Sequence, residues 1–131
     1  MAKRIGYLCF LPLFIGGLIY IFFRKAGLLS ISLPVFDISR TTFWKVILDT
    51  LPDFCWAFSF SNALHIFLYT FGLSFWKSTL FILVAICGSE LLQILLPQYF
   101  TFDIVDLLAE LFAVFLSSIY FYRKVNENKA F

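Results

Sequence analysis

The stretch GSELLQILLP at positions 88–97, continued by QYFTFDIVDLLAE at positions 98–110, decides how the chain folds. It ends one long apolar run, turns at Pro97 and opens a second apolar run. Because Glu90 and Gln93 are three residues apart, they share one face when the first run is helical. The stretch therefore predicts two consecutive helices joined by a short turn, with polar side chains close to that turn.

Acidic side chains form a stripe along the start of the second run. Asp103, Asp106 and Glu110 follow the i, i+3, i+7 spacing of one helical face. Ionisable residues inside a membrane-spanning segment are costly, and they face the protein interior or a cavity rather than lipid. If both runs cross a bilayer, these three carboxyl groups and Glu90 are candidates for a functional site.

The composition indicates an integral membrane protein. Of the 131 residues, 62% are hydrophobic and 14% are charged, whereas ordinary soluble domains are about 25% charged. The net charge of +2 and the lack of a basic cluster argue against a nucleic-acid partner. Cys9, Cys55 and Cys87 lie in apolar runs without a Cys-x-x-Cys spacing, so we interpret them as small hydrophobic residues.

Long apolar runs predict an all-α fold, a bundle of four transmembrane helices with an interfacial segment between the first and second helices. About twenty apolar residues cross the hydrocarbon core of a bilayer. The predicted spans are residues 5–23, 54–76, 78–96 and 104–122, within a single transmembrane domain over residues 1–131. Residues 24–53 form the predicted membrane-surface loop, in which Thr41–Leu51 is a short interfacial helix that stops before Pro52.

The basic residues predict the orientation of this bundle. Four spans put both termini on one side of the membrane, together with six Lys and Arg residues, against four on the other side. By the positive-inside rule this excess favours cytoplasmic termini, which places the turn at Pro97 on the outer side.

A second polar stripe lies in the second predicted span, where Asn62, His65 and Tyr69 share one helical face. At 1.5 Å per residue, Asn62, Glu90 and Glu110 lie about 10–13 Å in from the outer ends of their spans. We therefore expect the stripes to meet in a polar binding cavity in the outer half of the bilayer. The predicted cavity residues are Asn62, His65, Tyr69, Glu90, Gln93, Asp103, Asp106 and Glu110.

The charge balance of this cavity leaves several alternatives. The spans contain no Lys or Arg at the depth of the acids, and like-charged carboxylates in a low-dielectric site cannot all stay ionised. Either a carboxyl group is protonated and hydrogen-bonded between helices, or a cation binds, or Arg40 or Lys45 reaches down from the loop. A single histidine with scattered acids lacks the ligand spacing of a zinc site, so we expect no metal and no cofactor.

The acid-x-x-Gln pattern at residues 90–93 and the Asp-x-x-Asp pattern at residues 103–106 resemble the VanZ-like family of small bacterial membrane proteins. His65 and Tyr69 match the family's His–(three residues)–Tyr pattern, and the resemblance covers roughly residues 61–116. It implies four spans in the bacterial cytoplasmic membrane and an association with glycopeptide resistance, and it carries no settled reaction. The chain departs from the family pattern at Ser61 (usually Asp), Phe100 (Arg), Glu110 (Asn) and Ala113 (Gly).

Three functions compete. The first is a non-enzymatic envelope protein that binds a lipid-linked or amphipathic molecule, membrane lipids, or a partner membrane protein through the polar cavity. The second is an intramembrane enzyme acting on a lipid, with His65 or Glu90 as general acid or base, although no serine or cysteine stands in a recognisable nucleophile motif. The third is a small proton- or cation-coupled transport subunit, because proton relays need buried acids.

Overall fold

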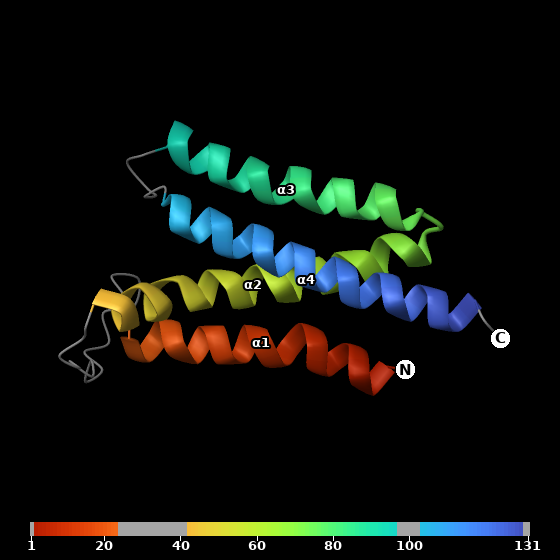
Figure 1. Ribbon diagram of the computed structural model, residues 1–131, viewed down its shortest axis with the longest axis horizontal. Coiled ribbons are helices and arrows are strands. Elements are labelled where there is room, and N and C mark those ends of the chain that lie inside the picture. Colours follow the sequence, from red (N-terminus) through yellow and green to blue (C-terminus); the bar gives the residue numbers. More distant parts are fainter. Residues whose placement is uncertain (1, 24–41, 97–102, 130–131) are drawn as a thin grey trace.

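The computed structural model describes residues 2–23, 42–96 and 103–129, and within these ranges it contains four helices and no strand. The helices are α1 (Ala2–Phe23), α2 (Thr42–Thr70), α3 (Phe75–Leu95) and α4 (Ile104–Lys129) (Figure 1). The all-α fold is therefore confirmed for the described residues. Most of the predicted surface loop, residues 24–41, and the turn at residues 97–102 lie outside them.

The arrangement of the helices is organised around α2. This helix contacts each of the other three, whereas α1 contacts α2 alone among the described helices, and α3 packs on α2 and α4. In Figure 1, α1 and α3 lie on opposite sides, with α2 and α4 between them. The start of α1, the turn between α2 and α3, and the end of α4 lie at one end of the molecule.

The course of α2 corrects two predictions. Residues 42–70 form one continuous helix with Pro52 inside it, so the predicted helix stop before Pro52 and the separate interfacial helix are wrong. Proline removes one backbone hydrogen bond, but a helix can continue through it where it packs against a neighbouring helix. The helix also ends at Thr70, before the predicted end at Trp76, because the chain turns through Gly72 at a φ of +81°, where glycine is favoured.

Close packing of α1 explains why the helix survives at Pro52. A Cβ added to Gly16 would lie 2.8 Å from the Cβ of Cys55 and 3.3 Å from the carbonyl oxygen of Pro52. Small residues of this kind let two helix backbones approach each other. The contact buries Gly16 and Pro52 together, so α1 covers the part of α2 that carries the proline.

Replacing Gly16 by alanine is expected to destabilise the contact between α1 and α2 by about 1–3 kcal/mol. The added methyl group would meet the Cβ of Cys55 and the carbonyl oxygen of Pro52, which can move only together with the backbone of α2. Gly17→Ala is the matched control, because a Cβ at Gly17 meets nothing within 4 Å. Thermal unfolding of both variants in the same detergent measures the difference. Equal melting temperatures for the two variants would contradict this close approach.

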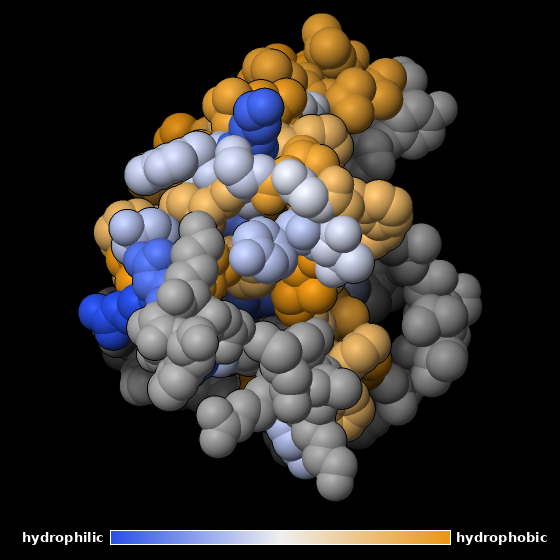
Figure 2. All heavy atoms as spheres, turned by 90° about the vertical axis from the view of Figure 1, so that its right-hand side faces the viewer, coloured by the Kyte–Doolittle hydropathy of each residue, from blue (hydrophilic) through white to orange (hydrophobic). Residues whose placement is uncertain are grey.

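Two of the helices are suited to a membrane. Within the described residues, Phe75–Leu95 of α3 and Ile104–Asn126 of α4 are long and apolar enough to cross a bilayer. Their outward side chains include Leu80, Val84 and Phe115, each about 60% exposed. Figure 2 shows apolar side chains gathered over the side of the molecule where α3 lies. These two helices support a membrane location, and the four-span bundle stays a prediction.

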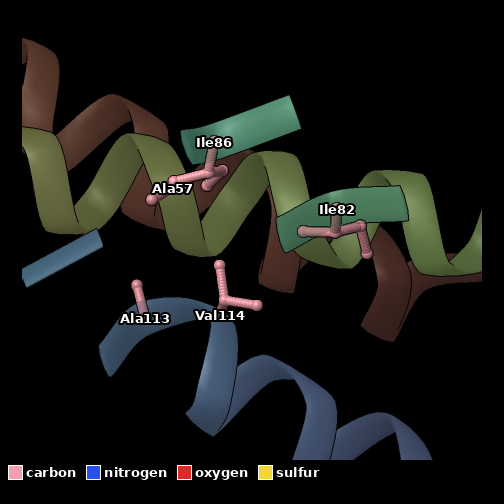
Figure 3. Packing of buried hydrophobic residues seen from close by; sticks show 5 residues of the cluster. All are labelled: Ala57, Ile82, Ile86, Ala113 and Val114. Carbon is pink, nitrogen blue, oxygen red and sulfur yellow. The ribbon is translucent and has the colours of Figure 1, made fainter. Parts of the chain in front are cut away.

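The core lies where α2, α3 and α4 meet. It consists of small and β-branched residues, namely Ala57, Ile82, Ile86, Ala113 and Val114, of which none is more than 1% exposed. Figure 3 shows Ala113 and Val114 pointing from α4 toward α2, and Ile86 lying close to Ala57. This apolar layer separates the polar groups on either side of it.

Candidate functional site

A carboxyl cluster lies on one side of the apolar core. Glu90 of α3 and Glu110 of α4 are 4% and 5% exposed, and their carboxyl groups lie within hydrogen-bonding reach of each other. Asp53 of α2 and Asp106 of α4 are close enough to interact electrostatically with Glu110. Three helices therefore contribute acidic side chains to one place, which we call the carboxyl cluster (Asp53, Glu90, Asp106 and Glu110); the two glutamates are buried and the two aspartates are half-buried.

Hydrogen bonds define the chemistry of this cluster. The side-chain amide of Gln93 donates to Oε1 of Glu90 over 2.6 Å, one helical turn along α3. A hydrogen bond between two carboxyl groups requires that at least one of them holds a proton. The Oε2 atoms of Glu90 and Glu110 are buried and receive no N–H or O–H donor from the described protein groups. The cluster can therefore accept hydrogen bonds from a donor-rich ligand.

Asp103 does not belong to the carboxyl cluster. Its side chain is exposed, and its Oδ1 accepts a hydrogen bond of 2.9 Å from the backbone N–H of Val105. This is the geometry of a helix N-cap, in which a carboxylate satisfies an open N–H group and the positive end of the helix dipole. Asp103 is thus the N-cap residue of α4, and its carboxylate serves the start of the helix rather than the predicted cavity.

His65 of α2 forms the centre of a second polar group. It is 0% exposed, and its Nδ1 and Nε2 atoms lie 3.0 Å and 3.1 Å from the hydroxyl oxygens of Ser78 and Ser118. We call these three residues the histidine relay. It connects the middle helix to the start of α3 and to the second half of α4.

The direction of the relay follows from one further contact. The hydroxyl of Ser78 donates to the carbonyl oxygen of Phe75, so it can only accept from His65. In a neutral imidazole this assigns the proton to Nδ1 and leaves Nε2 to accept the hydroxyl proton of Ser118. The rings of Phe75 and Phe121 stack on the two sides of the imidazole, with centroids 5.7 Å and 4.9 Å away.

The carboxyl cluster and the histidine relay are two separate sites. Ser118 lies eight residues beyond Glu110, which is about 12 Å along α4. The apolar residues Ile86, Ala113 and Val114 fill part of the distance between them (Figure 3). The prediction of one polar cavity shared by His65 and the acids is therefore corrected, because helical periodicity gives the face of a residue but not its level against a neighbouring helix.

The two remaining predicted residues lie apart from both groups of hydrogen bonds. Asn62 is 2% exposed, but its side-chain amide donates to the carbonyl oxygen of Phe58 on its own helix over 2.8 Å. Tyr69 is 44% exposed, and its ring meets the edge of Phe121. Asn62 thus satisfies its donor locally, and Tyr69 packs beside the histidine relay.

Sequence reasoning missed Ser78, Ser118 and Asp53. The serines stand in apolar runs, where a single hydroxyl commonly serves only as a hydrogen-bonding contact between helices. A signal existed in the antiparallel course of α3 and α4: moving back from Glu90 along α3 corresponds to moving forward from Glu110 along α4. That register brings a serine of each helix to the level of the histidine.

Within the described residues, no group of three or more His, Cys, Asp or Glu side chains is arranged to hold a metal ion. Comparison of the chain with protein-family models, with curated proteins and with solved structures finds no match.

Proposed function

We propose that this chain is a non-enzymatic, VanZ-like protein of the bacterial cytoplasmic membrane that binds the polar end of an amphipathic or lipid-linked molecule at the carboxyl cluster. Its four helices would each cross the bilayer with cytoplasmic termini. Support comes from the length and apolar composition of α3 and α4 and from the burial of Glu90 and Glu110 between these helices.

The observation that carries the proposal is the pair of buried carboxyl oxygens, Oε2 of Glu90 and Oε2 of Glu110, which have no donor among the described residues. Leaving such atoms unsatisfied costs free energy, which a bound hydroxyl or amino group recovers. Carboxyl groups accept hydrogen bonds and attract cations, so the favoured ligand carries sugar hydroxyls or an amine. A phosphate without such donors would be repelled by the same charges.

The resemblance to the VanZ-like family adds to this proposal. With cytoplasmic termini, the connection between α3 and α4 faces outward, and the carboxyl cluster lies within reach of lipid-linked envelope molecules. A link to glycopeptide resistance would follow if such a molecule carried the drug's target or its substitute.

The test is the identity of the lipids that copurify with the protein. Wild type, Glu90→Gln and the control Ser61→Ala are purified from the same membranes in mild detergent, and the bound lipids are measured by mass spectrometry. Ser61 is buried, and its hydroxyl has no hydrogen-bond partner within the described part of the chain, but it lies two turns along α2 from Asp53. We expect one amine- or sugar-bearing lipid to be enriched with wild type and control, and reduced at least about fivefold with Glu90→Gln. Identical lipid profiles for all three proteins would refute the proposal.

The histidine relay favours a second candidate, an intramembrane enzyme that transfers an acyl group. A serine hydroxyl that donates to an imidazole, itself oriented by a third group, is the arrangement of an activated nucleophile. Ser118 lies on the wall of an apolar cavity between α3 and α4. Covalent labelling by a fluorophosphonate, abolished by Ser118→Ala and kept by Ser117→Ala, would make this candidate the stronger one.

A further inference from the structure

An apolar groove runs between α3 and α4, from Arg123 to the level of Leu111, the residue that follows Glu110. Its volume is about 660 Å³. Residues along its length include Phe75, Trp76, Leu83, Leu111, Phe115 and Arg123. The groove therefore has aromatic and aliphatic walls along its length and a cationic side chain at one end.

The length of the groove suits one acyl chain. From Arg123 to Leu111 it follows twelve residues of α4, which is about 18 Å along a helix. The hydrocarbon part of one leaflet is about 15 Å thick, half of a core of about 30 Å. An acyl chain whose head group lies at Arg123 would thus reach the level of Leu111 near the middle of the bilayer.

The two ends of the groove differ in chemistry. Trp76, Tyr122 and Arg123 stand at one end, and Leu83 and Leu111 at the other. Tryptophan and tyrosine gather at the head-group level of membranes, so the aromatic end marks the bilayer surface. Figure 2 views the molecule from this end and shows hydrophilic side chains across its middle, beside the apolar side chains of α3.

The charge at this end is complementary to an anionic head group. Among the described side chains of α3 before Glu90 and of α4 after Glu110, the charged residues are Lys77, Arg123 and Lys124. The N-terminus of α3 lies at the same end and carries the positive end of the helix dipole. The side chain of its N-cap residue, Ser74, makes no capping hydrogen bond, so backbone N–H groups of the first turn stay open. Basic side chains and open N–H groups at one end of a groove are what a phosphodiester requires.

We propose that the groove between α3 and α4 binds one acyl chain of an anionic phospholipid, with the phosphate against Arg123. The lipid comes from the leaflet on the side of the chain termini. The head-group end of this site, at Arg123, lies at the opposite end of α4 from the carboxyl cluster, and the lipid site does not depend on the ligand proposed for that cluster; Ser118 of the histidine relay also lines the groove. Neutral lipids share the acyl chain but lack the net negative charge, so they compete weakly.

Trp76 serves as the reporter of the test. In a Trp44→Phe, Trp56→Phe background it is the remaining tryptophan. The protein is placed in phosphatidylcholine vesicles, and brominated phosphatidylglycerol or brominated phosphatidylcholine is added in increasing amounts. Quenching of Trp76 then gives the relative binding constant of the two lipids. We expect a preference of about fivefold for phosphatidylglycerol, the usual effect of one basic side chain near the surface.

Three variants distinguish groove binding from general attraction. Arg123→Gln is expected to bring the preference close to one, Arg123→Lys to keep it, and Thr79→Phe to remove it by placing a ring in the groove while Arg123 stays. Arg4→Gln on α1 is the matched control and keeps the preference, because α1 does not contact α3 or α4. Equal quenching by both lipids in the parent protein, or an unchanged preference in Arg123→Gln or Thr79→Phe, overturns the proposal.

Discussion

Glu110→Ala is expected to lower the free energy of unfolding by about 3 kcal/mol, whereas Glu110→Gln lowers it by less than about 1 kcal/mol. Alanine leaves a void where α2, α3 and α4 meet, and it removes the hydrogen-bond partner of the buried Glu90 carboxyl. Glutamine keeps the volume, and its amide can donate to Glu90 without a shared proton. Both values are measured by unfolding the three proteins with increasing amounts of a denaturing detergent and following the loss of helix by circular dichroism.

A double-mutant cycle isolates the contact between the two carboxyl groups. The cost of Glu90→Ala is measured in the wild type and again in the Glu110→Ala protein, where the partner is already absent. We expect the second cost to be smaller by about 1 kcal/mol or more, since residues that share a hydrogen bond are not additive. Additive costs would show that the two carboxyl groups do not interact, and a glutamine variant as unstable as the alanine variant would show that side-chain volume does not account for the cost.

The fold was predictable where apolar runs are bounded by charges. α1 and α3 begin and end within three residues of the predicted spans, because length and hydropathy decide such helices. α4 begins at the predicted residue 104 but continues seven residues past the predicted end, to Lys129. α2 was not predictable in the same way, since it begins among charges and contains Pro52. Its continuity depends on tertiary packing against Gly16, a contact that no local pattern records.

The candidate site was predictable by face but not by level. The spacing of Glu90 and Glu110 indicated an inward direction for each, and both side chains are buried. The same reasoning placed His65 beside them, whereas it contacts Ser78 and Ser118 instead. A residue's level depends on the register between two helices, which is fixed by side-chain packing across the whole interface. Helical periodicity and short turns therefore fix the relative level of two side chains on neighbouring helices only to within several residues. For this reason the sequence predicted one site where the structure has two.

His65→Ala is expected to cost about 4 kcal/mol of unfolding free energy, and His65→Phe about 2 kcal/mol. Phenylalanine fills the space between the rings of Phe75 and Phe121 but removes both hydrogen bonds of the imidazole.

The hydrogen bonds of the relay are not equivalent, and this allows a sharper measurement. Ser78 keeps the carbonyl oxygen of Phe75 as an acceptor when His65 is replaced, whereas the described contacts give Ser118 no second side-chain partner. Most of the cost of His65→Phe should therefore arise at Ser118, and adding Ser118→Ala to that variant should recover about 1 kcal/mol. Ser78→Ala in the same background should recover nothing. Thermal unfolding of the single and double variants decides the matter: recovery by Ser78→Ala instead would reverse the direction assigned to the relay.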